Sequence, residues 1–254
     1  MNNSEGKIAV ITGATGGIGF QVAKRLGQDG YKVILNGIED KKGLDSVKEL
    51  AGLGIDSEYY GFDVTQDDQV NSNIKSIGEK YGRIDVLVNN AGGLGGRSRF
   101  EEMTTDFYRF VMALNLDSVF FASRAAIPYL KKGDNASIIN FTSNAGWTAG
   151  GPGAGIYGTS KAGVHSITRA LAKDLAEYGI RVNAVSPGTI DTPFHAQIKA
   201  TKPEVFKSWA NNIMLGRLGQ PEDVASVVSF LASKDAGFIT AETIQIGGGQ
   251  ALGI

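Results

Sequence analysis

The segment Lys-Ile-Ala-Val-Ile-Thr-Gly-Ala-Thr-Gly-Gly-Ile-Gly occupies residues 7–19 of a chain of 254 residues. Residues 7–12 form a short apolar run rich in β-branched side chains, which is typical of a strand buried on both faces. After the glycines, apolar residues recur at helical spacing from Ile18 to Leu26. The segment therefore predicts a buried strand, a tight turn and a helix in immediate succession.

A turn of this kind suits a phosphate group. The N-terminus of a helix carries unpaired N–H groups and a partial positive charge, which attract a pyrophosphate. Glycines in the turn allow a sharp bend, a close approach of the backbone to the phosphate, and close packing of the helix on the sheet. We therefore expect the phosphates of a dinucleotide to bind at these residues: Gly13, Thr15, Gly16, Gly17 and Ile18.

Strands and helices alternate along the rest of the chain. The predicted strands are 7–12, 31–35, 58–62, 84–88, 136–141, 180–185 and 243–246, and the predicted helices are 18–26, 41–53, 67–81, 106–130, 157–178 and 221–231. This order favours an α/β fold of Rossmann type, a doubly wound parallel sheet of about seven strands with helices on both faces. No linker divides the chain, so we expect one domain over 1–254. Residues 1–90 would mainly bind the dinucleotide, and residues 91–254 would supply catalysis, substrate loops and subunit contacts.

Composition excludes several classes of function. With 25 Lys+Arg against 26 Asp+Glu and a pI near 6.2, the chain lacks the basic surface that a nucleic acid needs. It has no cysteine and only two histidines, so we expect no disulfide and no metal site. Residues 1–7 do not resemble a leader sequence, and no apolar run is long enough to cross a membrane. We expect a cytoplasmic protein with neither membrane nor nucleic-acid partners.

Motifs further along the chain resemble those of one enzyme family. The turn 12–19, the Asn89-Asn90-Ala91-Gly92 segment and the Tyr157-Gly158-Thr159-Ser160-Lys161 segment are together similar to the motifs of short-chain dehydrogenases/reductases. The segments 183–188 and 247–249 fit the same pattern. The resemblance covers essentially the whole chain in order. It implies a Rossmann-type fold, a nicotinamide cofactor, and the transfer of hydride to or from a carbonyl carbon.

The candidate catalytic residues are Asn115, Ser143, Tyr157 and Lys161. Tyr157 and Lys161 lie four residues apart on a predicted helix, so their side chains project from one face. An ammonium beside a phenol favours the phenolate, and we therefore expect Lys161 to lower the pKa of Tyr157. The resemblance implies that Tyr157 donates the proton, Ser143 orients the carbonyl, and Asn115 holds a relay water against the lysine. Thr142 is a neighbouring hydroxyl, and one residue more separates Ser143 from Tyr157 than in some relatives.

The resemblance also assigns residues to the cofactor. It implies that the phosphate turn, Tyr157 and Lys161 contact the cofactor. At the adenosine end it adds Asp63 and Val64 at the adenine, Gly37 and Ile38 at the ribose 2′ position, and Asn90, Ala91 and Gly92 along the adenosine. At the nicotinamide end it adds Pro187, Gly188, Ile190 and Thr192. Gly37 stands where an acidic residue would bind a 2′-hydroxyl, and Ile38 where an arginine would bind a 2′-phosphate. Glu39 and Asp40 would repel that phosphate, although Lys41 and Lys42 could still reach it. The cofactor is thus NADH or NADPH, and the sequence favours NADH.

Four further segments point to the substrate: 92–97, 150–157, 192–196 and 214–217. They are similar to the loops of bacterial reductases of 4-deoxy-L-erythro-5-hexoseulose uronate, which form 2-keto-3-deoxy-D-gluconate in alginate catabolism. A small uronate carries a carboxylate, which needs a cation or a cluster of N–H donors. The candidate substrate-binding residues are Arg97, Ser143, Trp147, Gly150, Gly151, Tyr157 and His195.

Three alternatives stay open at this point. A 3-oxoacyl-(acyl carrier protein) reductase or a sugar or sugar-acid dehydrogenase would share the same catalytic motifs, and a cofactor-binding regulator would share the fold. The predicted helix 106–130 is apolar almost all round, which indicates burial on both sides. We expect its outer side to contact a second subunit of a homotetramer, although burial within one chain would explain the pattern too.

Overall fold

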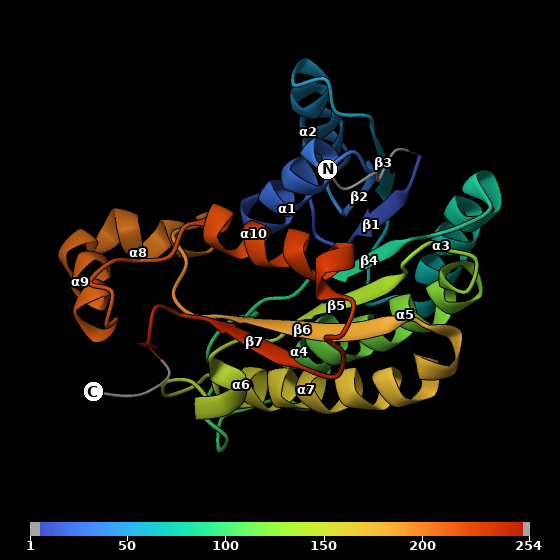
Figure 1. Cartoon of the computed structure of the whole chain (residues 1–254). Coiled ribbons are helices and arrows are strands. Elements are labelled where there is room, and N and C mark those ends of the chain that lie inside the picture. The colour runs from blue at the N-terminus through green and yellow to red at the C-terminus, as the bar shows by residue number, and fades with distance from the viewer. Residues whose placement is uncertain (1–5, 251–254) are drawn as a thin grey trace.

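A computed structural model describes residues 6–250, apart from the side chain of residue 197, as a seven-stranded sheet with helices on both faces (Figure 1). Residues 1–5, where we expect no leader, lie outside the described part of the chain. The sheet has the order β3-β2-β1-β4-β5-β6-β7, and every neighbouring pair is parallel. The strands are β1 (Ile8–Ile11), β2 (Lys32–Gly37), β3 (Ser57–Gly61), β4 (Val86–Asn89), β5 (Ser137–Phe141), β6 (Arg181–Pro187) and β7 (Thr243–Ile246). The predicted fold class is confirmed.

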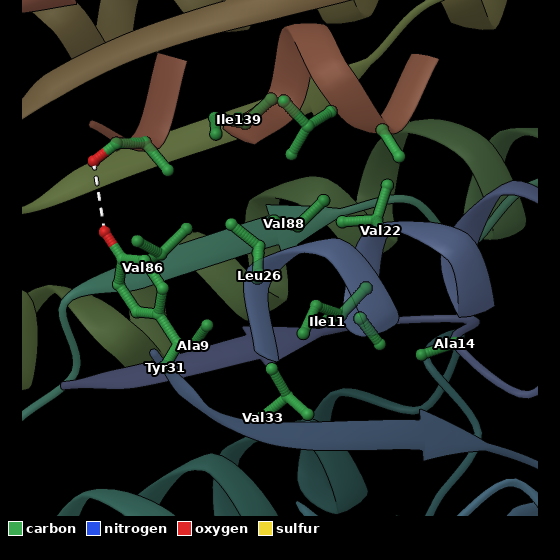
Figure 2. Close-up of a cluster of buried hydrophobic side chains, with 14 of the residues drawn as sticks. Ala9, Ile11, Ala14, Val22, Leu26, Tyr31, Val33, Val86, Val88 and Ile139 are labelled. Atoms are coloured by element: carbon green, nitrogen blue, oxygen red, sulfur yellow. Dashed lines mark hydrogen bonds between the residues drawn. The ribbon is translucent and has the colours of Figure 1, made fainter. Parts of the chain in front are cut away.

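Alternate residues of β1 enter two separate apolar cores. Ala9 and Ile11 belong to the core beneath α1 (Gly17–Gln28), α2 (Asp40–Gly52) and α10 (Pro221–Ala232), which Figure 2 shows in part. Ile8 and Val10 belong to the core beneath α3 (Asp67–Tyr81), α5 (Ser118–Leu130) and α7 (Gly155–Leu175). Since both faces of the strand are buried, its sequence is apolar without alternation, as the sequence analysis supposed.

The strand order reverses at β1, which pairs with β2 on one side and with β4 on the other. The chain leaves β1 toward helices on one face of the sheet and leaves β4 toward helices on the other face. Two loops that diverge in this way leave a crevice at the carboxyl ends of the strands, where open α/β sheets bind ligands. The motifs 12–19 and 89–92 both lie at this crevice.

The predicted helix 106–130 is interrupted. It consists of α4 (Thr105–Met112), a π-helical turn over Ala113–Asp117, and α5. A π turn inserts one extra residue, so the faces of the two flanking segments are rotated relative to each other. By length and composition alone, Thr105–Leu130 is apolar enough to span a membrane, as core helices of globular proteins also are. Only 39% of its most apolar 18-residue window is buried within this chain.

Short helices occupy two regions for which no helix was predicted. The variable region after β6 contains a turn at Pro193–His195, α8 (Ala196–Thr201), α9 (Pro203–Ser208) and a turn at Trp209–Asn212. A single helical turn, α6 (Ala145–Thr148), lies between β5 and α7. In Figure 1, α8 and α9 extend to one side of the sheet, and α6 packs near the start of α7.

Candidate active site

In the phosphate turn, backbone atoms pack closely against other backbone atoms. Gly13 has φ 62°, and a Cβ there would lie 2.9 Å from Cα of Ala91. A Cβ on Gly19 would collide with the carbonyl of Gly13. Helix α1 begins at Gly17 with no side chain capping its first N–H groups. The turn therefore offers unpaired donors and open backbone where a pyrophosphate would bind, and the residues fit a dinucleotide.

Asn90 locks this turn to the loop after β4. Its Nδ2 donates to the carbonyls of Thr12 and Gly13, both at 2.9 Å. In return, Thr12 Oγ1 accepts from the backbone N–H groups of Asn90, at 3.1 Å, and Ala91, at 3.0 Å. The side chain of Asn90 thus holds the two walls of the crevice together.

The adenosine end of the crevice lies over β2 and β3. One carboxylate oxygen of Asp63 accepts from the N–H (2.9 Å) and hydroxyl (2.8 Å) of Thr65. Gly37 packs so closely on Thr15 that a Cβ would lie 2.6 Å from its methyl carbon. The side chain of Ile38 is 69% exposed at the surface beside it. Asp63 is therefore fixed, with a second oxygen left for a ligand, while no charged group occupies the position of Gly37.

The loop after β6 contains the residues expected at the nicotinamide. The carbonyl of Pro187 accepts from Asn144 N–H at 3.0 Å, and a Cβ on Gly188 would lie 2.8 Å from Cα of Gly247. Ile190 is buried and pairs with Gly219. Thr192 lies across the crevice from Gly17, whose added Cβ would be 3.8 Å from that of Thr192. The residues expected at the phosphates and those expected at the nicotinamide therefore lie near one another.

Lys161 is buried on α7, with 3% of its surface exposed. Its Nζ donates to the carbonyl of Phe141 at 2.9 Å and lies 5.9 Å from the ring centroid of Tyr157. Burial lowers the pKa of Lys161 to about 8, because the charged form loses its water. The structure thus brings the two residues of the Tyr-x-x-x-Lys motif onto one face, as predicted.

Tyr157 is half-buried and forms a side-chain hydrogen bond with Ser143. Burial raises the pKa of Tyr157, and the hydrogen bond with Ser143 opposes this only in part. The pKa of Tyr157 therefore shifts in the direction opposite to the prediction: burial is the largest cause, and Lys161, whose ammonium donates to Phe141, is not among the groups that shift it. The phenol is held in its protonated form.

Two adjacent hydroxyls at the end of β5 have different surroundings. Thr142 is buried and donates to the carbonyl of Val185 at 3.1 Å. Ser143 is half-buried, and its Oγ accepts from the N–H of Ala145 at 3.2 Å. Of the two, Ser143 is the hydroxyl that pairs with Tyr157.

Asn115 lies in the π turn and is fully buried. It accepts from Gly93 N–H at 2.9 Å and donates to the carbonyls of Gly93 and Val111 at 2.8 and 2.9 Å. A Cβ on Gly92 would lie 2.7 Å from Asn115 Oδ1 and 2.9 Å from Lys161 Nζ. Asn115 and Lys161 therefore meet at the backbone of Gly92, although they are far apart in sequence.

The candidate substrate residues fall on two rims of the crevice. On one rim, Arg97 donates from Nη1 to the carbonyl of Pro152 at 2.9 Å, next to Gly150 and Gly151. Residues 98–101, 149–153 and 155 line a cavity of about 630 Å³ there. On the other rim, His195 lies within an aromatic cluster with Phe194, Phe206 and Trp209, and burial lowers its pKa. Trp147 packs on His165 and donates to Ser186 at 3.2 Å.

The comparison with known protein families agrees with this geometry. Residues 13–251 match the profile of the family described as Enoyl-(Acyl carrier protein) reductase. The chain belongs to the short-chain dehydrogenase/reductase family. It is accordingly an NAD(P)-dependent oxidoreductase.

Relatives within this family carry different names. The chain is 42% identical to 3-oxoacyl-(acyl-carrier-protein) reductase FabG of Thermotoga maritima over 250 residues, covering 98% of this chain and 99% of the relative. It is 37% identical to 7alpha-hydroxysteroid dehydrogenase of Bacteroides fragilis, covering 99% and 97%. The solved structure of Thermoplasma acidophilum aldohexose dehydrogenase superposes with a TM-score of 0.88 at 34% identity, covering 99% and 96%. Family membership therefore leaves the substrate to be argued from the loops.

Two features of this short-chain dehydrogenase/reductase site were missed by the sequence analysis. The carbonyl of Phe141 binds Lys161, but a backbone acceptor carries no sequence signal. His165 lies four residues after Lys161 and therefore on the same helix face, a spacing that the sequence does display. Among residues 6–250, no group of three or more His, Asp or Glu side chains is arranged to hold a metal ion.

Proposed function

We propose that this enzyme reduces a carbonyl of a small uronate with NADH, most specifically 4-deoxy-L-erythro-5-hexoseulose uronate to 2-keto-3-deoxy-D-gluconate. The observation that carries the proposal is the exposed guanidinium of Arg97, which donates to the carbonyl of Pro152 and borders the backbone of residues 151–153. A guanidinium beside glycine N–H groups suits a carboxylate and several hydroxyls. The similarity of four loops to uronate reductases supports the same substrate.

The bound nicotinamide supplies the hydride in this reaction. Ser143 donates a hydrogen bond to the substrate carbonyl oxygen, and the Tyr157 phenol delivers its proton to that oxygen as negative charge develops there. When the cofactor is bound, we expect Lys161 to place its positive charge beside the phenol and so to stabilise the phenolate that remains. Asn115 fixes the loop at Gly92 against Lys161 and completes the relay that returns a proton to the tyrosine.

The residues that would hold the cofactor follow from the crevice. The backbone of residues 13–18 binds the pyrophosphate, Asp63 and Val64 the adenine, residues 90–92 the adenosine side, and residues 187–192 the nicotinamide. Three local features support NADH over NADPH. Gly37 carries no charge, Ile38 is apolar, and Lys42 is paired with Glu39 at 2.6 Å. Glu39 and Asp40 would repel a 2′-phosphate here, and Lys41 would attract it.

One experiment tests the substrate and the cofactor together. Oxidation of NADH and of NADPH is followed with unsaturated alginate monomers, 3-oxoacyl thioesters and aldose or sugar-acid substrates. We expect the highest kcat/KM for the uronate with NADH. A higher kcat/KM for 3-oxoacyl thioesters would overturn the proposed uronate substrate. A strong preference for NADPH would overturn the proposed choice of NADH.

The second candidate function is reduction of 3-oxoacyl-(acyl carrier protein). The 42% identity with the Thermotoga maritima reductase favours it. Such a substrate is delivered by an acidic carrier protein, which requires a basic docking surface near the crevice. The chain has 25 Lys+Arg against 26 Asp+Glu and therefore no excess of basic residues, so we favour the uronate as the substrate.

Arg97 provides a sharper test of the uronate. Arg97→Ala should raise KM for the uronate roughly tenfold to hundredfold, because a hydrogen bond to a charged group is worth about 1.5–3 kcal/mol. The KM for an uncharged aldehyde should change far less, since it lacks the carboxylate. Steady-state kinetics with both compounds measures the contrast. Equal effects on the two KM values would mean that Arg97 does not bind the carboxylate.

We also propose a cytoplasmic homotetramer. Aromatic side chains are exposed on the long helical segment, among them Tyr108, Phe110 and Phe120. Phe238, in the loop before β7, is fully exposed. Exposed aromatic residues on ordered elements mark protein contacts in the complete assembly.

A further inference from the structure

Helix α7 continues the face of its motif for one more turn. Tyr157, Lys161 and His165 follow one another at steps of four residues, so their side chains lie in one row. His165 is 7% exposed, which makes it almost as buried as Lys161. The proposed reaction assigns no role to this histidine.

The imidazole of His165 lies between two other elements. On one side, its ring centroid is 4.2 Å from that of Trp147 in α6. On the other side, its Nδ1 is 3.1 Å from Oγ1 of Thr243, the first residue of β7. Trp147 is held in turn by its indole N–H, which donates to Ser186 Oγ in β6 at 3.2 Å.

The second nitrogen of His165 faces Gly146. A Cβ on Gly146 would lie only 2.8 Å from His165 Nε2, so a larger residue would not fit there. Nε2 is buried and has no hydrogen-bond partner among the described residues. An unpaired buried nitrogen costs stability, and an apolar side chain would avoid that cost. Stability alone therefore does not explain a histidine at this position.

The active-site serine, Ser143, lies two residues before α6. Ser143 Oγ accepts from Ala145 N–H at 3.2 Å, and Ser143 O accepts from Gly146 N–H at 2.8 Å. A single helical turn is not stable in isolation, so contacts with neighbouring elements fix its position. Gly146 and Trp147, which contact His165, are two of the four residues of α6.

We infer that His165 is a positioning residue, which acts through Gly146 and Trp147 to hold Ser143 in register with Tyr157. The inference rests on the proposed roles of Ser143 and Tyr157. The three residues of this row on α7 then have different roles. Tyr157 and Lys161 act at the crevice, and His165 fixes the short helix that follows the serine.

The test compares His165→Ala and His165→Phe with a matched control, Ser166→Ala, at the exposed neighbouring position. The kinetics use whichever carbonyl compound the wild-type enzyme reduces fastest, so a wrong substrate assignment shows itself separately, in the wild type. We expect both His165 variants to lower kcat about tenfold to hundredfold, as small misplacements of reacting groups do. The Kd of the cofactor and the kinetics of the control should stay within about twofold, since α1 is not involved.

A double-mutant cycle distinguishes positioning from a general loss of structure. Trp147→Ala and His165→Ala combined should cost no more kcat than the worse single variant, because both act through α6. His165→Phe keeps a flat ring beside Trp147, and it replaces His165→Ala in the kinetic test if the alanine variant does not fold. A kcat within twofold of wild type in a folded His165 variant would overturn the inference. So would effects of His165→Ala and Trp147→Ala that simply add.

Discussion

Tyr157 is the residue on which the chemistry depends most. Tyr157→Phe removes the hydroxyl and leaves the ring, so the site keeps its packing. Turnover should fall about 10²- to 10⁴-fold, the usual contribution of a positioned acid, while cofactor binding persists. Steady-state kinetics and fluorescence titration with NADH measure the two effects. Tyr108→Phe, on exposed α4, is the matched control and should change neither. Full activity of Tyr157→Phe would refute the assignment.

The protonation of Lys161 predicts a pH dependence. Burial lowers the pKa of Lys161 to about 8, so the ammonium is present below this pH and disappears as the pH rises through it. Burial raises the pKa of Tyr157, which keeps the phenol protonated over the same range. We therefore expect kcat/KM for reduction to decline above about pH 8, and a profile measured from pH 6 to 10 tests this. A flat profile, or one unchanged in Lys161→Ala, would contradict the role of the lysine.

At the scale of elements, the contact between α1 and the phosphate turn should be intolerant of any side chain. Gly19→Ala places a methyl group against the carbonyl of Gly13, which is backbone and has little freedom to move. We expect a loss of about 1–3 kcal/mol in stability and weaker NADH binding, since overpacking displaces α1. Thermal unfolding and calorimetric titration measure both.

Gly52→Ala in α2 is the control, because nothing lies within 4 Å of its Cβ position. It should be neutral or stabilise the protein by up to about 1 kcal/mol, as alanine does in a helix. If Gly19→Ala behaved like this control, the close packing at the turn would be unimportant.

Long elements with a clear hydrophobic period could be predicted from the sequence most successfully. All seven predicted strands and the predicted long helices are present with ends shifted by a few residues, except that the predicted helix 106–130 is divided by the π turn. The π turn was missed because hydrophobic periodicity averages over several turns and does not resolve one inserted residue. Its trace in the sequence is Asn115, a polar residue within an apolar helix. The helices α6, α8 and α9 are too short to show any period.

Some features of the candidate site could likewise be predicted from the sequence, and others could not. The pairing of Tyr157 with Lys161 follows from spacing on a single helix, so the sequence predicts it. The contact of Lys161 with Phe141, and that of Asn115 with Gly93, join separate elements through backbone atoms. Such contacts depend on strand register and on loop shape, which no local pattern encodes. The sign of the pKa shift at Tyr157 was wrong because burial is a property of the folded molecule.

At the scale of the whole molecule, the outer side of the long helical segment predicts assembly. Phe110 is 47% exposed and Phe120 is 44% exposed, and both lie on ordered helices. Phe110→Glu combined with Phe120→Glu should lower the mass in solution from about four chains to two or one, because charge in an apolar contact is costly. Light scattering on a sizing column measures the mass. Leu53→Glu, exposed at the end of α2, should leave it unchanged. A wild-type mass of one chain would refute the assembly.

The glycines of the crevice differ in how much sequence change they permit. At Gly13 and Gly19 the nearest neighbours are backbone atoms, which have little room to yield. At Gly93 and Gly151, on the substrate side, the nearest atoms to an added Cβ are 3.9 and 3.8 Å away. Drift among descendants of this gene should therefore be freer at Gly93 and Gly151 than at Gly13 and Gly19. New substrates can evolve on such a scaffold without renewed selection for the cofactor.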